Sequence, residues 1–514
     1  MLLLTFWMNF GSLRARFGPI DDHELADFLG ADKRLSFWSI PSEWISKTEV
    51  GNLGSGTRFR WLYSLQRLFE VAVFRDNAGF MYAVRTITIA LGALLIFLIL
   101  YQNIEINKSE RLKSFSLQVI LSLPIPVAAT IWYLSTISIT SGFSRIGTQE
   151  PGLVLGLLLV TFGLLRIVRD PLTMGRVNFL LIAFGSIVAT GFKENGYVVI
   201  LPLMLGLIIR LKYLFKWPEM AALLIASISM AAVLYHNVRA LARGSDTIVG
   251  TKSGAGMVHA ILDRFDSPRF LLILACFLIL VSVSQKLANS AAKSNVVILA
   301  WCLTLHLSEA VFYGEDTVVM RYEAVSDIAT ILAVSVTVQA VLNLTSPEHA
   351  LLSLRNIFQY PLIAVVLVLY LYPFQIFSQL RDASYSLARS TRGYQQTIEN
   401  LSFYLSEHPS SSLVIYLFDT AADAEPSHAM IKYLRMEGIE NSIFFAVREV
   451  DAIPSETLLG YRKLSENGNK YLSLEPWFKL QRSSSDACFS PTYNLDNPAV
   501  PEANEVQLYC GYLG

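Results

Sequence analysis

Long apolar runs alternate with short polar loops through the first three quarters of this chain. Most of these runs approach the roughly twenty residues that a straight helix needs to cross a bilayer. The predicted spans cover residues 80–101, 115–134, 151–168, 178–192, 195–209, 219–237, 270–285, 295–311, 324–342 and 358–376. Counting the shorter run Met1–Phe10 as a first span, the pattern predicts a mainly α, polytopic membrane protein with about 11 transmembrane helices.

Two of these spans leave alternatives open. The runs 178–192 and 195–209 could be two helices, or one re-entrant or broken unit, because only a short polar step separates them. Pro124 and Pro126 are expected to kink the 115–134 helix, which a helix bundle tolerates.

Basic residues predict the orientation. The loops 102–114, 166–177, 210–218 and 285–294 each hold two or three Lys or Arg. The opposite short loops hold one basic residue each, and these are Arg145, Lys193 and Arg321. Because cytoplasmic loops carry an excess of Lys and Arg, the first set is cytoplasmic. The N-terminus is then inside, and the C-terminal region is outside.

The first outer loop, residues 13–79, contains an amphipathic segment. Between Arg58 and Phe74, apolar residues recur at helical spacing with Arg and Gln between them. The many aromatic residues favour a helix that lies in the membrane interface. An ordinary surface helix of a soluble subdomain is the alternative.

The chain changes character near residue 379. Residues 412–418 are predicted to form a strand, 423–436 a helix and 442–446 another strand, so that 379–514 forms a soluble, extracytoplasmic α/β domain after a membrane domain of residues 1–378. It lacks a phosphate-binding glycine motif, so no nucleotide cofactor is expected. An outward position makes a Cys488–Cys510 disulfide a candidate, with two unpaired thiols as the alternative.

Composition agrees with the membrane prediction. Of 514 residues, 53% are hydrophobic and 16% are charged, and the mean hydropathy is +0.46. The 41 basic and 41 acidic residues balance, so charge offers no reason to expect a nucleic-acid partner.

Acidic and basic residues recur at the predicted outer ends of the spans. A short run after the first apolar segment holds Asp21, Asp22 and Glu24. These residues could have purely structural roles instead, as helix caps, interface anchors or snorkelling side chains. The outer ends of later spans carry Arg145, Glu150, Lys193, Glu194, Arg321 and Tyr322.

This layout suits a lipid-linked phosphosugar, which presents an apolar tail, a phosphate and a sugar at the bilayer surface. Arg or Lys would hold the phosphate and stabilise its charge as it leaves. A carboxylate would take the proton from an acceptor hydroxyl, or help to hold a divalent metal.

In their order and sidedness, these residues resemble the GT-C superfamily of integral-membrane glycosyltransferases, which use polyprenyl-phosphate-linked sugars. Protein O-mannosyltransferases and aminoarabinose transferases are examples. The resemblance covers residues 1 to about 376. It is carried by Asp21-Asp22 in the first outer loop, the Lys193-Glu194 step before Pro202, and Arg321-Tyr322 in a late outer loop.

The resemblance implies an envelope glycosyltransferase in a bacterial inner or plasma membrane, surrounded by membrane lipid. Its acceptor would be a glycan, a lipid or a protein. Asp21 or Asp22 would be the catalytic base. The other would orient it or, with Glu150, contribute to a Mg or Mn site. Lys193 and Arg321 would bind phosphate. The remaining substrate-binding candidates are Glu24, Arg145, Glu194 and Tyr322.

Two other functions stay open at this point. A transporter or flippase of a lipid-linked or anionic substrate would want polar residues near mid-membrane and repeated halves, and the sequence shows no clear repeat. A non-catalytic scaffold would place the binding function in the C-terminal domain.

Overall fold

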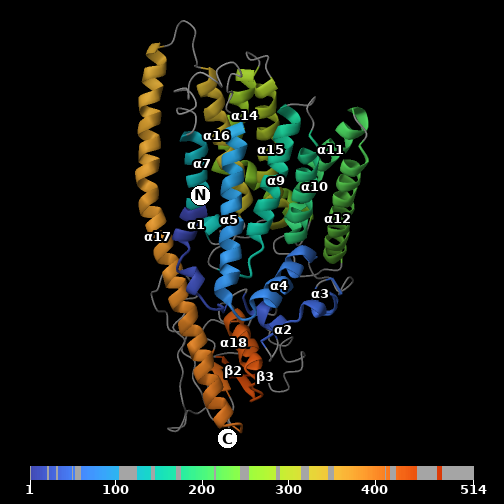
Figure 1. Ribbon diagram of the computed structural model, residues 1–514, viewed down its shortest axis with the longest axis vertical. Coiled ribbons are helices and arrows are strands. Elements are labelled where there is room, and N and C mark those ends of the chain that lie inside the picture. Colours follow the sequence, from blue (N-terminus) through green and yellow to red (C-terminus); the bar gives the residue numbers. More distant parts are fainter. Residues whose placement is uncertain are drawn as a thin grey trace.

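The computed structural model (Figure 1) is mainly α-helical. It describes residues 2–19, 22–29, 33–48, 50–51, 59–102, 124–140, 145–169, 175–213, 216–242, 254–284, 290–313, 323–344, 352–410, 413–416, 424–447 and 472–476. The helices of the first half are α1 (Leu2–Met8), α2 (Ala26–Leu29), α3 (Ile40–Ser46), α4 (Trp61–Phe74), α5 (Ala78–Gln102), α7 (Pro124–Ser135), α8 (Ile137–Thr140), α9 (Glu150–Arg169), α10 (Arg176–Phe192), α11 (Ile200–Tyr213) and α12 (Trp217–Ala242). The second half holds α13 (Gly254–Phe265), α14 (Pro268–Ser284), α15 (Ser290–Tyr313), α16 (Ala324–Leu344), α17 (Leu352–Glu407) and α18 (Ala424–Met436).

Four helical segments in the described part of the chain are long and apolar enough to cross a membrane. They are Ala78–Gln102, Glu150–Arg169, Glu194–Lys212 and Trp217–Arg239. Shorter apolar helices cover Arg176–Phe192, Pro268–Ser282 and Ala324–Ala340. The mainly α fold with candidate membrane spans is therefore confirmed, whereas the count of eleven spans and their orientation stay predictions.

The predicted first span is short in the structure. Helix α1 has seven residues, so it rises about 10 Å, against a hydrocarbon core of about 30 Å. It packs against α5 and α17. Helix α7 begins at Pro124, and residues 103–123 lie outside the described part, so the predicted kink there is not tested.

The pair α10 and α11 forms two separate antiparallel helices. Lys193 has an extended backbone between α10 and the 3-10 helix η5 (Glu194–Val199), which leads into α11. At the far end of α11, the Arg210 guanidinium lies 3.8 Å from the ring centroid of Phe179, near the start of α10. The chain therefore turns back at Lys193, so the two runs are not one helix broken at that point, and the choice between two spans and a re-entrant pair stays open.

Glycines bring α9 and α10 close together. A Cβ added to Gly156 would lie 2.4 Å from the backbone nitrogen of Ala189 and 2.7 Å from the carbonyl oxygen of Gly185. Small residues of this kind let helix backbones approach closely in a membrane. Because the helices run antiparallel, this packing brings Glu150, the first residue of α9, beside Lys193, which follows α10.

Several helices begin or end at the same end of the bundle. The Ser138 hydroxyl donates to Asp327 at 2.6 Å, which joins α8 to the start of α16. Arg269, at the start of α14, lies 2.9 Å from the same carboxylate. We call this end, with Glu150, Lys193 and Asp327, the site end. It is the lower end of the bundle in Figure 1, next to α2 and α4.

Two large apolar cores and a small cluster around Phe192 are present in the described part of the chain. The first lies among the bundle helices, mainly α5, α7, α9, α10, α14, α15 and α16. The second joins the N-terminal segment to the C-terminal helices, because Phe17 and Leu25 share it with Leu387 of α17 and Met430 of α18. The N-terminal segment is thus packed against a part of the chain almost 400 residues later.

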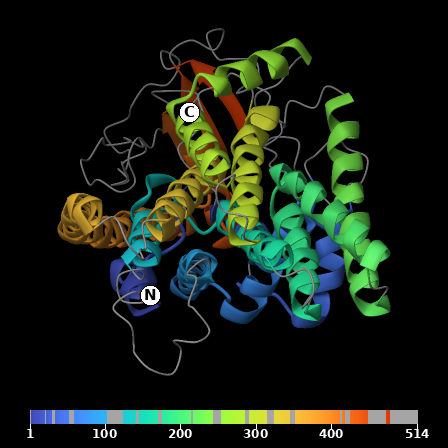
Figure 2. The same cartoon turned by 90° about the horizontal axis from the view of Figure 1, so that it is seen from above.

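Helix α17 runs beyond the bundle. It has 56 residues, so the predicted boundary at 378–379 falls inside a continuous helix. Figure 1 shows it along one side of the molecule, and Figure 2 shows it at the edge opposite α12. The strands β1 (Leu413–Tyr416), β2 (Ile443–Val447) and β3 (Leu472–Pro476) form a parallel sheet in that order.

The first two strands and α18 between them fall in the segments where the sequence predicts a strand, a helix and a strand. Residues 448–471 and 477–514 lie outside the described part, so a complete α/β domain stays a prediction. The cysteines Cys488 and Cys510 lie there too.

Candidate active site

Asp22 is the buried centre of the candidate site. It begins the 3-10 helix η2 (Asp22–Leu25), and its side chain accepts hydrogen bonds from three parts of the chain. Oδ1 accepts from the backbone N–H groups of Ile146 at 2.7 Å and Gly147 at 3.1 Å. Oδ2 accepts from the Gly18 N–H at 2.8 Å and from the Tyr82 hydroxyl at 3.4 Å.

These bonds give Asp22 a positioning task. A carboxylate offers about four acceptor directions, and the described donors take two on each oxygen. Asp22 thereby ties its own loop to α5 and to the segment before α9. Its neighbour Asp21 lies outside the described residues, and so do Arg321 and Tyr322.

Two buried arginines meet on the segment that Asp22 holds. The Ile146 carbonyl accepts from Arg67 at 2.8 Å and from the Arg85 Nε at 3.0 Å. Both arginine residues are 1% exposed. The Tyr63 hydroxyl lies 2.7 Å from the Gly147 carbonyl and 3.2 Å from Glu24.

The two arginines differ in their ion pairs. Arg67 lies 2.9 Å from Glu70, one turn further along α4. No carboxylate of the described chain lies within 4.0 Å of the Arg85 guanidinium. Glu70 and Glu150 act on its charge from beyond ion-pair distance, and each is paired with another cation. A buried charge without a paired counterion is costly, so Arg85 is suited to receive an anion.

Glu150 and Lys193, both predicted site residues, pair with each other. The Lys193 Nζ donates to a Glu150 oxygen, and both side chains are almost fully buried. Glu194, beside Lys193, receives two bonds from Arg60, from Nε at 2.9 Å and from the second guanidinium nitrogen at 3.1 Å. Two acid–base pairs therefore lie side by side where α10 turns into η5.

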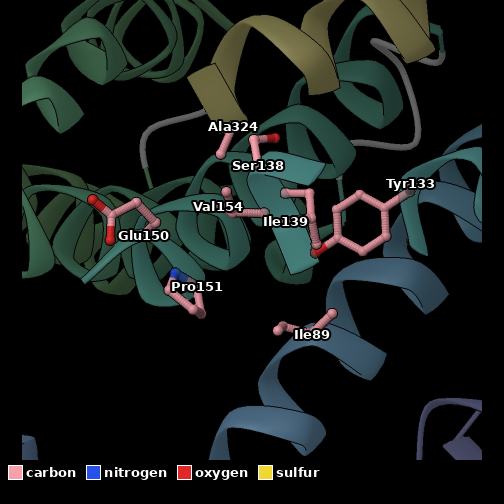
Figure 3. Close-up of a pocket in the computed structure, with 8 residues that line it drawn as sticks. All are labelled: Ile89, Tyr133, Ser138, Ile139, Glu150, Pro151, Val154 and Ala324. Carbon is pink, nitrogen blue, oxygen red and sulfur yellow. The ribbon is translucent and has the colours of Figure 1, made fainter. Parts of the chain in front are cut away.

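A small pocket opens next to Glu150 (Figure 3). Its free volume of about 10 Å³ accommodates roughly one water molecule. It is lined by Ile89, Tyr133, Ser138, Ile139, Glu150, Pro151, Val154 and Ala324. In Figure 3 the apolar side chains of Val154 and Ile139 lie between Glu150 and Tyr133. The pocket has a charged end and an apolar wall.

A second polar cluster adjoins this pocket through Ser138. Arg269 contacts Glu323 and Asp327, and Ser138 donates to Asp327. Ser326, the residue before Asp327 on α16, donates its hydroxyl to Glu309 of α15, which is fully buried. Arg264, at the end of α13, lies 3.8 Å from Glu309.

The structure thus brings Asp22, Glu24, Glu150, Lys193 and Glu194 to the site end. Arg145, also predicted, lies half-buried in the segment that Asp22 holds. Sequence reasoning missed Arg60, Arg67, Glu70, Arg85 and the cluster around Asp327. Arg85 could have been found, because it is a charged residue inside an apolar span and such residues are functional candidates.

The predicted divalent cation site is not tested, because Asp21 lies outside the described residues. The described residues contain no group of three or more His, Cys, Asp or Glu side chains that could hold a metal ion. Asp22 and Glu150, the two predicted ligands, direct oxygens to Ile146, Gly147 and Lys193.

Comparison of the chain with protein-family models, curated proteins and solved structures finds no match. A functional proposal therefore rests on the sequence pattern and on the geometry of the site.

Proposed function

We propose that this protein is a membrane glycosyltransferase that moves a sugar from a polyprenyl-phosphate-linked donor to an acceptor at the outer face of the membrane. The observation that carries the proposal is the gathering of buried carboxylates and cations at one end of an apolar helix bundle. Asp22, Glu150 and Lys193 meet there with Arg67 and Arg85. Such charges are expensive next to lipid and indicate a functional site.

The two aspartates have different tasks in this proposal. Asp21 is the base that takes the proton from the acceptor hydroxyl as the sugar is transferred. Asp22 orients it, which its four described hydrogen bonds support. The GT-C resemblance left the choice between them open, and the bonding of Asp22 favours Asp21 as the base.

Cations hold the donor phosphate. Arg85 adds a candidate to Lys193 and Arg321, because its buried charge faces no carboxylate of the described chain at ion-pair distance. A guanidinium can bond two phosphate oxygens at once. It would stabilise the negative charge that grows on the phosphate as the bond to the sugar breaks.

The membrane setting follows the sequence prediction. The chain spans a bacterial inner or plasma membrane about eleven times, with the site end and the C-terminal segment outside. Helix α4 lies in the interface with Phe69 and Val73 exposed, while Arg67 and Glu70 face inward. The 94% exposed Trp38, just before α3, extends this surface. Aromatic residues favour the level of the lipid head groups.

Sugar transfer in membranes tests the proposal. The Asp21→Asn variant is compared with wild type using a polyprenyl-phosphate-linked sugar, and transfer should fall at least about 100-fold. Asp76→Asn is the matched control, because Asp76 is an exposed acid between α4 and α5. Undiminished transfer by a folded Asp21→Asn protein would exclude the assigned role. Substrate flux across sealed vesicles without transfer would indicate a flippase instead.

A further inference from the structure

The N-terminal segment that leads to Asp22 is clasped along its length by α17 and α18. The Gly11 N–H donates to the Ser384 hydroxyl at 3.1 Å, and the Arg16 N–H donates to the Thr391 hydroxyl at 3.0 Å. The Gln395 side chain donates to the Phe17 carbonyl at 3.0 Å. These bonds join residues more than 370 positions apart.

The contact is close enough to exclude a side chain at its first point. A Cβ added to Gly11 would lie 2.4 Å from the backbone of Ser384 and of Tyr385. No real Cβ makes such a contact, so the N-terminal segment and α17 meet backbone to backbone. The clasp therefore depends on a glycine at position 11.

Gly18 connects α18 to Asp22, because it bonds to both. The Tyr433 hydroxyl of α18 donates to the Gly18 carbonyl at 2.8 Å. The N–H of the same glycine donates to Asp22 Oδ2, also at 2.8 Å. The Tyr433 ring stacks on Phe17, with ring centroids 6.4 Å apart. The position of Gly18, and with it one oxygen of Asp22, is thus fixed from α18.

We propose that α17 and α18 hold the segment that leads to Asp22, and that Tyr433 is a positioning residue that acts on Asp22 through Gly18. The hydrogen bonds from α17 and α18 anchor the segment that leads to Asp22. The effect on sugar transfer rests on the proposed function, whereas the effect on loop order does not.

Removing the Tyr433 hydroxyl tests its hydrogen bond to Gly18 separately from the packing of its ring. Tyr433→Phe keeps the ring on Phe17 but leaves the buried Gly18 carbonyl without that donor. Tyr394→Phe is the matched control, because the Tyr394 hydroxyl is also buried and donates to a carbonyl, that of Pro426 at 3.1 Å. Each variant loses one described neutral hydrogen bond to a buried carbonyl, so their unfolding midpoints should fall by similar amounts.

Two measurements on the full-length protein test the proposal. Amide exchange in peptides covering residues 12–25 should speed up about five- to tenfold in Tyr433→Phe and stay as in wild type in Tyr394→Phe. For sugar transfer, kcat should fall by a similar factor in Tyr433→Phe with the KM for the lipid-linked donor unchanged.

The outcomes separate the two proposals. Unchanged exchange over residues 12–25 in Tyr433→Phe overturns the positioning role, and so does an equal increase in Tyr394→Phe. A faster exchange with an unchanged kcat would overturn the claim that loop order matters for transfer. If wild type transfers no sugar, the proposed function fails, while the exchange experiment still decides whether α18 orders the loop.

Discussion

Replacing Asp22 by Asn tests the orienting role assigned to it. The amide has one oxygen where the carboxylate has two. If that oxygen keeps the Ile146 and Gly147 N–H groups, the amide NH₂ must face the Gly18 N–H, which is also a donor. The opposite orientation fails on the other side, where two backbone donors would face the NH₂ group. At least one buried hydrogen bond is lost whichever way the amide turns.

The size of the effect follows from these bonds. A hydrogen bond to a charged group contributes about 1.5–3 kcal/mol, and a buried donor left unpaired costs about 1–3 kcal/mol. The bonds that remain are weaker because they no longer end on a charge. Together these losses should lower the free energy of unfolding by about 3–5 kcal/mol.

Equilibrium unfolding in mixed detergent and SDS micelles measures this difference. Asp76→Asn, at an exposed acid, should change the free energy of unfolding by less than about 0.5 kcal/mol. Amide exchange should rise in Asp22→Asn alone, either at Gly18 or at Ile146 and Gly147, according to which side the amide NH₂ faces. An Asp22→Asn protein as stable as wild type, with all three amides still protected, would refute the account of this residue.

Three further predictions concern the Glu150–Lys193 pair, the packing of α9 on α10, and a buried histidine of α18. Glu150→Gln and Lys193→Met should each destabilise the protein by about 3–5 kcal/mol, and the double variant by less than their sum, as unfolding of all three would show. Gly156→Val should cost about 3 kcal/mol or more, because its Cβ meets the α10 backbone, while Gly206→Ala, with only a side chain at 3.4 Å, should be tolerated; thermal unfolding compares them. Burial, aided by the charge of Lys432, lowers the pKa of His428 to about 4, so the unfolded chain binds more protons between about pH 6.5 and pH 4. Stability should therefore fall as the pH drops through that range, and His428→Gln should flatten the slope in unfolding midpoints measured from pH 4 to 7.

The long apolar helices could be predicted because run length and composition decide them. The predicted span 80–101 became α5, Ala78–Gln102, and 324–342 became α16, Ala324–Leu344. The end of α17 could also have been predicted from the sequence. Pro409 disfavours the α conformation at His408, the residue before it, and α17 ends at Glu407. The change to polar residues near 379 hid that continuous helix.

Periodicity could not say which face of α4 turns inward. It shows which residues share a face, but the buried face includes Arg67 and Glu70 as well as Leu68. Arg67 donates to the Ile146 carbonyl, which comes from another element, so the sequence of α4 alone does not reveal this partner. Pairs such as Asp22 with Ile146, 124 residues apart, leave no local signal in a single sequence.

The central claim is that the site end transfers sugar from a polyprenyl-phosphate donor, and reconstitution tests it most directly. Purified protein in liposomes would be given a labelled polyprenyl-phosphate sugar, with release of free polyprenyl phosphate measured for wild type, Asp21→Asn and Arg85→Met. The account predicts acceptor-dependent release by wild type, a loss of about 100-fold or more in Asp21→Asn, and a raised donor KM in Arg85→Met. Equal release by wild type and Asp21→Asn, or no release with any acceptor class, would contradict it.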